Sequence, residues 1–196
     1  MKNKWISTII ICMMAGAIVL TGCGGKDSAS KEEASKSESA GEETSGAEEE
    51  GKEEIAKDFT LAMTDSYTFT DPQDLDFDQR FVLVGEAGCK LLTDMGNMGY
   101  NADKMYEILY AKDGVPVGEY QYFVAPDEEN AASLAEFYKS QGQNITVEGN
   151  VLYAYSEGDV IEATIVTFAS TGTITDETPE AYIEMMKSFN GLMEYE

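Results

Sequence analysis

Three alternating aspartates are the first residues whose spacing could do chemistry. Asp74, Asp76 and Asp78 alternate within the stretch DPQDLDFDQ, and an EF-hand calcium loop begins with oxygen ligands spaced in this way. That loop also requires a glycine at its sixth position and a glutamate at its twelfth, where this chain has Gln79 and Gly85. In an extended strand the three carboxylates would share one face. We interpret them as a solvated strand face, and we assign no metal ligand and no cofactor.

Catalysis by a nucleophile or by paired carboxylates finds little support. Cys89 would need a base, usually histidine, to act as a nucleophile, and the chain contains no histidine. We therefore expect Cys89 to be a small buried hydrophobic residue. Residues 55–196 contain 26 acidic residues, so composition selects no particular carboxylate pair for hydrolysis. The sequence does not decide whether the domain is an enzyme, and it favours a non-catalytic domain.

Tyrosines form the most suggestive pattern, because they alternate along three stretches with β-strand character. The six candidates for ligand binding are Tyr106, Tyr110, Tyr120, Tyr122, Tyr153 and Tyr155. Alternate residues of a strand lie on one face. A tyrosine combines a flat apolar ring with a hydroxyl group, which suits a surface that recognises a glycan, a peptide or a protein. The same residues also pack well across strands, and both interpretations are kept.

The N-terminal residues have the layout of a secretory signal. Lys2 and Lys4 precede an almost continuously apolar run from Trp5 to Val19, followed by small residues, as in a signal peptide. The run from Trp5 to Leu20 has 16 residues, whereas a transmembrane helix needs about 20. Cleavage is therefore favoured over permanent spanning of the membrane.

The stretch Leu20-Thr21-Gly22-Cys23 resembles the lipobox of bacterial lipoproteins. The resemblance implies that the Cys23 thiol receives a diacylglycerol and that cleavage leaves Cys23 as the first residue. It further implies an anchor on the extracytoplasmic face of the cell membrane, where two acyl chains hold a protein firmly. The alternative is an ordinary signal peptide in which Cys23 is incidental. The resemblance covers residues 1–23 only.

Composition divides the remaining chain into a linker and a domain. Residues 24–54 consist of Gly, Ser, Ala, Thr, Glu, Asp and Lys, which bury too little apolar surface to offset the entropy of ordering. Residues 55–196 suit one compact domain, with seven basic residues and a net charge of −19 that excludes nucleic acid as a partner. We predict a signal peptide at 1–22, a lipidated cysteine with a disordered acidic linker at 23–54, and a single α+β domain at 55–196.

Two stretches of the domain look alike. Residues 108–125 and 151–169 each read as a hairpin with a branched residue, Leu, Tyr and Ala in the first strand and a Gly-containing turn. Helices are expected to follow, with N-caps at Asp127 and Thr178. The sequence therefore predicts an α+β fold: an antiparallel sheet built from a duplicated strand-strand-helix unit, with helices packed on one face.

These observations favour a lipid-anchored extracytoplasmic protein with a non-catalytic binding domain. Its partners would be the membrane, through the diacylglycerol on Cys23, and a protein, peptide or glycan of unknown identity. The alternatives are a small carboxylate-dependent hydrolase and a structural component of the envelope.

Overall fold

The computed structural model describes residues 55, 56 and 58–196. The signal peptide, the lipidated Cys23 and the acidic linker, all predicted for residues 1–54, lie outside this described part of the chain. Within it the chain forms four helices and two antiparallel sheets, which confirms the predicted α+β class. A search of these residues for a helix long and apolar enough to cross a membrane finds none.

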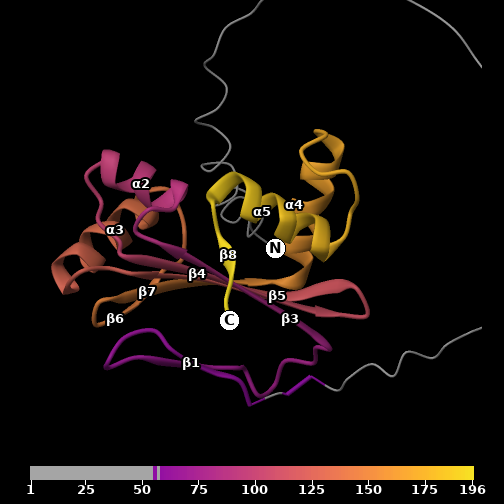
Figure 1. Cartoon of the computed structure of the whole chain (residues 1–196), viewed down its shortest axis with the longest axis horizontal. Coiled ribbons are helices and arrows are strands. Elements are labelled where there is room, and N and C mark those ends of the chain that lie inside the picture. The colour runs from indigo at the N-terminus through magenta and orange to yellow at the C-terminus, as the bar shows by residue number, and fades with distance from the viewer. Residues whose placement is uncertain (1–54, 57) are drawn as a thin grey trace, which may run out of the picture.

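The larger sheet has six strands in the order β6-β7-β5-β4-β3-β8, and every neighbouring pair is antiparallel (Figure 1). Its strands are β3 Gln79–Glu86, β4 Lys104–Lys112, β5 Val115–Val124, β6 Thr146–Glu148, β7 Val151–Glu157 and β8 Met193–Glu194. The predicted hairpin over 108–125 is confirmed as β4 and β5. Its turn places Asp113 and Gly114 at φ 50° and 75°, as a two-residue hairpin turn requires.

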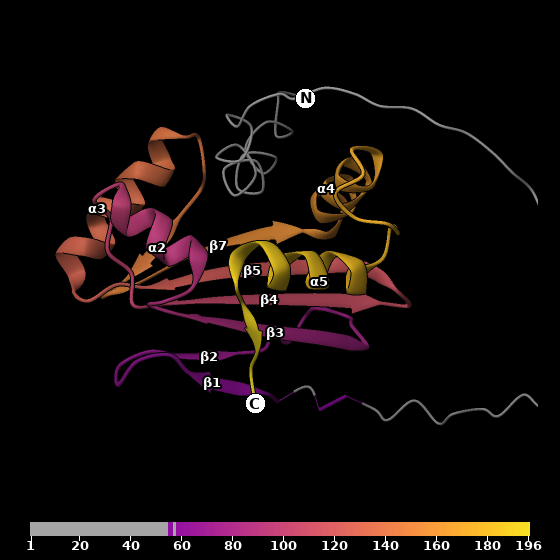
Figure 2. The ribbon, with the colours of Figure 1, turned by 45° about the horizontal axis from the view of Figure 1, so that its top comes forward.

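All four helices cover one face of this sheet, as predicted (Figure 2). They are α2 Lys90–Asn97, α3 Glu128–Ser140, α4 Gly158–Ser170 and α5 Pro179–Asn190. Between helices and sheet lies one apolar core, in which Leu109, Phe123 and Leu152 of the sheet are buried with Leu134 of α3 and Ile161 of α4. Burial of this apolar surface is the main force that holds the helices on the sheet.

Two predicted helix starts are confirmed by their caps. The Asp127 carboxylate accepts a hydrogen bond from the Asn130 backbone N–H at 2.8 Å, at the start of α3. The Thr178 hydroxyl oxygen accepts one from the Ala181 N–H at 3.2 Å, at the start of α5. Gly191 ends α5 in the left-handed conformation, at φ 72°. Side-chain caps and a terminal glycine are local signals, so they are readable from sequence.

The prediction of a second hairpin over residues 151–169 is wrong, because residues 158–170 form helix α4 and not a strand. The β-branched residues of this segment suggested a strand, yet Ile161, Thr164 and Ile165 keep helical spacing and form the buried side of α4. Packing on the sheet overrides their β propensity. The predicted turn at Gly158 is a strand-to-helix junction where a Cβ atom would lie 2.3 Å from the Pro116 carbonyl oxygen, so the residue must be glycine.

A second, two-stranded sheet covers the other face of the large sheet (Figure 2). It is the hairpin of β1 Thr60–Ala62 and β2 Thr68–Thr70. Leu61 and Phe69 of this hairpin are buried in a separate apolar core, together with Tyr106, Tyr110 and Tyr122 of the large sheet. The large sheet is therefore covered on both faces, by helices on one and by the hairpin on the other.

A buried carboxylate ties the hairpin to the sheet. Tyr110 Oη donates a hydrogen bond to Asp71 Oδ1 at 2.7 Å, and Arg80 Nη1 forms an ion pair with the other oxygen of the same carboxylate. The Arg80 guanidinium also donates to the Ala56 carbonyl oxygen at 2.9 Å and lies 4.3 Å from the centre of the Phe59 ring. Arg80 thus connects strand β3 to the segments on both sides of the hairpin.

We predict that Arg80→Met destabilises the domain far more than Lys90→Met. The first change leaves the Asp71 carboxylate buried without its ion-pair partner, which costs about 3 kcal/mol or more. Lys90 pairs with Asp94 on the exposed surface of α2, a contact worth about 0.5 kcal/mol or less. Urea unfolding of the two variants measures the difference. Equal losses of unfolding free energy would show that the Asp71–Arg80 pair does not secure the hairpin.

Candidate functional site

The structure brings all six predicted tyrosines to the face of the sheet that the β1–β2 hairpin covers. The hairpin buries three of them, since Tyr106, Tyr110 and Tyr122 are at most 3% exposed. Ring contacts with Phe69 of β2 and Phe77 hold two of these three in place. These three side chains are core residues and cannot touch a partner in this structure.

The other three predicted tyrosines form a surface where the cover ends. Tyr120 and Tyr153 are half-buried, and Tyr155 is 44% exposed. Tyr67, which precedes β2, adds a fourth ring at 6.4 Å from Tyr153. The centres of the Tyr120 and Tyr155 rings are 4.5 Å apart, and those of Tyr120 and Tyr153 are 6.4 Å apart. We name these four residues, Tyr67, Tyr120, Tyr153 and Tyr155, the aromatic strip.

Strand register and one glycine position the aromatic strip. Tyr120 of β5 lies directly opposite Tyr155 of β7, so their rings meet across the two strands. Gly118, on the same side of β5, leaves space that the Tyr155 ring and the Leu75 side chain occupy. A Cβ atom at Gly118 would lie 3.1 Å from both Tyr155 Oη and Leu75 Cδ2. The sheet therefore presents Tyr155 in a packed position while much of its ring stays accessible.

The hydroxyl groups of the strip stay protonated at neutral pH. Burial, together with the hydrogen bond that Tyr153 Oη donates to Glu148 Oε1 at 3.1 Å, raises the pKa of Tyr153 to about 12. Burial also raises the pKa of Tyr155, and the nearby charge of Glu157 acts in the same direction. Burial likewise raises the pKa of Tyr120. The strip consequently offers neutral rings and hydroxyl donors, which is chemistry for recognition.

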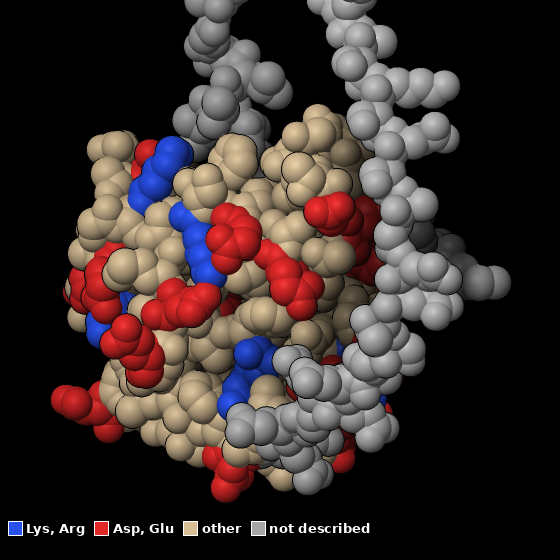
Figure 3. All heavy atoms as spheres, turned by 45° about the vertical axis from the view of Figure 1, so that its right-hand side comes forward, with Lys and Arg blue, Asp and Glu red and all other residues tan. Residues whose placement is uncertain are grey.

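Acidic side chains dominate the charged surface. Figure 3 shows Asp and Glu spread over one face of the domain with few Lys and Arg among them, in keeping with 26 acidic and seven basic residues between 55 and 196. A field of this sign attracts cations and repels anionic molecules such as acidic lipids.

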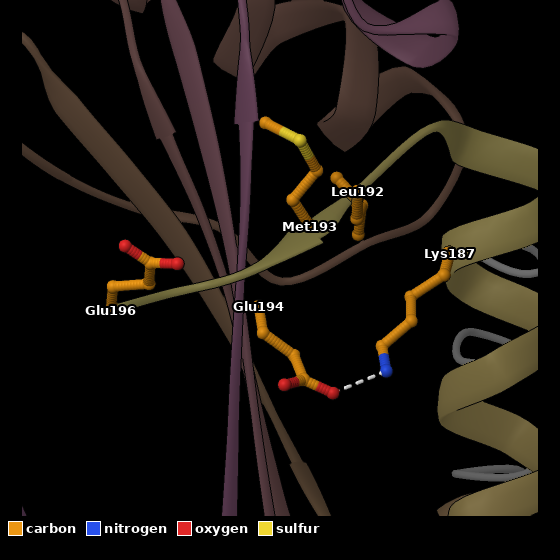
Figure 4. A pocket seen from close by; sticks show the side chains of 5 residues that line it. All are labelled: Lys187, Leu192, Met193, Glu194 and Glu196. Atoms are coloured by element: carbon orange, nitrogen blue, oxygen red, sulfur yellow. Dashed lines mark hydrogen bonds and ion pairs between the residues drawn. The ribbon is translucent and has the colours of Figure 1, made fainter.

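A hollow of about 680 Å³ lies at the C-terminal end of the chain (Figure 4). Its lining residues are Lys187, Leu192, Met193, Glu194 and Glu196. The Lys187 amine points toward Glu194 and pairs with it, and it also lies 2.6 Å from Glu184 Oε1. The positive charge of the hollow is thus already neutralised by two carboxylates.

Two carboxylates are buried on the helix-covered face of the large sheet. Glu107 is 0% and Glu119 is 5% exposed, and Glu119 accepts a hydrogen bond from Tyr182 Oη at 2.8 Å. Carboxylates that hydrolyse a glycoside must flank a cleft that admits the substrate. Neither residue lines the hollow at the C-terminal end, so their position favours a role in the core over a role in hydrolysis.

The interpretation of Asp74, Asp76 and Asp78 as a strand face is wrong, because these residues lie in the turn and irregular segment before β3. Asp78 accepts a hydrogen bond from the Asp113 N–H at 3.1 Å, and Asp76 pairs with Lys112 at 3.2 Å, so both brace the β4–β5 turn. Among residues 55, 56 and 58–196, no three Asp, Glu or Cys side chains are placed to hold a metal ion. Cys89 is a buried free thiol, as predicted, and burial raises its pKa.

Sequence reasoning missed three residues at this site: Tyr67, Glu148 and Glu157. Tyr67 lies outside the three stretches with alternating tyrosines, and nothing local indicates that its ring packs on Tyr122 of β5. Glu157 follows Tyr155 by two positions, so the alternation that selected Tyr153 and Tyr155 also places it on the same face. Extending the tyrosine pattern to acidic residues would have found Glu157.

Comparison with known proteins gives no relative: no family model, no curated protein and no solved structure matches the chain. Function must therefore be argued from the site itself.

We predict that the folded domain loses stability at alkaline pH. Burial raises the pKa of eight tyrosines in the folded state, whereas unfolded tyrosine ionises near pH ~10. Because these pKa values are raised on folding, the stabilisation is complete below about pH 10 and is lost as the pH rises through about 12, where Tyr153 titrates. Tyrosinate absorbance should rise at higher pH in the native chain than in the urea-unfolded chain. Coinciding titration curves would contradict the packing of these rings.

Proposed function

We propose that this protein is a lipoprotein, anchored on the extracytoplasmic face of the membrane, whose domain binds a partner without catalysis. The observation that carries the binding function is the exposed aromatic strip at β5 and β7. Tyr155 remains 44% exposed while its ring is packed against Tyr120. A rigid aromatic surface with hydroxyl donors is typical of recognition sites, since its rings lose little entropy when a partner is bound.

The anchor is supported by the sequence before the domain. The charged and apolar leader, the stretch from Leu20 to Cys23 and the acidic residues 24–54 follow one another in the order expected of a lipoprotein. A diacylglycerol on Cys23 would hold the chain at the membrane, and the linker would separate the acidic domain from anionic lipid.

The two alternatives have less support. For a carboxylate-dependent hydrolase, no pair of the 26 acidic residues is singled out, and Glu107 and Glu119 are buried in the core. A purely structural envelope component gives no reason for an exposed Tyr155 ring beside three half-buried tyrosines on one side of the sheet. The aromatic strip favours binding over both.

We predict that Cys23→Ala abolishes fatty acylation and releases the protein from the membrane fraction. Cells fed a clickable fatty acid should label the parent chain, because the Cys23 thiol is the acyl acceptor. Cys89→Ala is the matched control, since Cys89 is buried in the domain and its loss should leave labelling and fractionation unchanged. A labelled Cys23→Ala variant, or an unlabelled parent, would refute the anchor.

We predict that a photo-reactive phenylalanine analogue at position 155 forms adducts in intact cells, while the same analogue at position 195 does not. Tyr195 is 42% exposed, but it packs on Phe59 and Tyr106, away from the strip. Adducts at position 155 should diminish when Tyr153→Ala removes a neighbouring ring. Equal adducts at both positions, or none at position 155, would exclude the strip as the binding surface.

A further inference from the structure

The aromatic strip lies between two carboxylates. Glu148, next to Tyr153, accepts the hydrogen bond from its hydroxyl group. Glu157 follows Tyr155 on β7, and both side chains are exposed on the same side of the strand. A ligand lying along Tyr153 and Tyr155 would therefore meet a negative charge at each end.

These two carboxylates take no part in the ion pairs that the described residues form. Those ion pairs use the carboxylates of Asp71, Asp76, Glu86, Asp94, Glu184 and Glu194. The basic partners are Arg80, Lys90, Lys104, Lys112 and Lys187. Most of the described positive charge is thus committed elsewhere, and the strip keeps its negative potential.

Aromatic faces and carboxylates together select one kind of ligand. The face of a tyrosine ring attracts a Lys ammonium or an Arg guanidinium within about 6 Å of its centre. A carboxylate beside the ring adds a charge-assisted hydrogen bond to the same group. A neutral glycan can also donate hydroxyl hydrogen bonds to Glu148 and Glu157, as the Tyr153 hydroxyl does to Glu148, but it carries no positive charge for the carboxylates to attract.

The net charge of the domain further restricts which partner the aromatic strip can bind. Residues 55–196 carry −19, and acidic side chains are spread over the surface that Figure 3 shows. A second copy of this chain would bring the same charge and be repelled, and anionic lipid would be repelled as well. A basic segment of another protein is the partner that this surface attracts.

We propose that the aromatic strip binds a Lys- or Arg-bearing segment of a partner protein, with its cationic groups over Tyr155 and Tyr120 and beside Glu148 and Glu157. This inference rests on the proposed binding function and names the chemistry of the partner.

The test uses the full lipidated chain in detergent and isothermal titration at physiological ionic strength. The probes are a short peptide of alternating Lys and Gly, its Glu-Gly counterpart, and a neutral chitin oligosaccharide. The Lys-Gly peptide should bind most tightly. Tyr155→Ala should weaken its binding roughly threefold to tenfold, as expected for loss of a cation–π contact, and Tyr195→Ala should leave it unchanged. Tyr155→Leu keeps an apolar side chain on Gly118 and should weaken binding equally, which separates loss of the ring from loss of packing.

A charge-matched pair of double variants separates a specific site from diffuse attraction. The double variant Glu148→Gln with Glu157→Gln should bind the Lys-Gly peptide several-fold more weakly. The double variant Glu128→Gln with Glu136→Gln, on the exposed side of α3, should bind it with unchanged affinity. Equal weakening by both pairs would overturn the proposal. Binding of the chitin oligosaccharide or the Glu-Gly peptide that depends on Tyr155 and exceeds that of the Lys-Gly peptide would overturn the cationic partner but leave the binding function standing. If no probe binds in a Tyr155-dependent way, the cationic partner is refuted, and adduct formation at position 155 decides the binding function separately.

Discussion

One buried carboxylate, Asp71, fixes the position of the β1–β2 hairpin on the sheet, in addition to the apolar core that the two share. A carboxylate without partners would be too costly to bury, and here Tyr110 and Arg80 satisfy both of its oxygens. The helices need no such device, since one broad apolar core fixes them to the opposite face. The hairpin is short, and strands of this length are marginal on their own. Its docking therefore combines burial of Leu61 and Phe69 with a polar contact that only one geometry satisfies.

The hairpin also decides which tyrosines belong to the core and which to the surface. All of them alternate onto one face, but the cover ends over β5, so Tyr122 is buried while Tyr155 on the next strand is open. The aromatic strip is thus the uncovered margin of a core. Rings at such a margin are held rigidly by their buried neighbours, and this rigidity makes them better suited to recognition than isolated exposed aromatic residues would be.

Local chemistry made part of this architecture predictable. Caps at Asp127 and Thr178 and the turn at Asp113 and Gly114 are set by neighbouring residues, and all three are found where the sequence places them. The segment 158–170 was misjudged because β-branched residues on a buried helix resemble a strand until the packing partner is known. Which tyrosines would be buried was equally unpredictable, since it depends on where the β1–β2 hairpin packs on strands β4 and β5, far along the chain. The sequence therefore predicted that tyrosines would form the candidate site, but it did not predict which of them would be exposed.

The first and last described segments of the chain meet on the hairpin side. Phe59 packs against Tyr195 at 6.5 Å, and the Ala56 carbonyl is held by Arg80 of β3. Tension applied from the N-terminal side would therefore act on the large sheet at β3, through Arg80, and next to β8, through Tyr195. Strands β5 and β7 lie beyond β4 from both contacts, so the aromatic strip stands on the half of the sheet that this load reaches later.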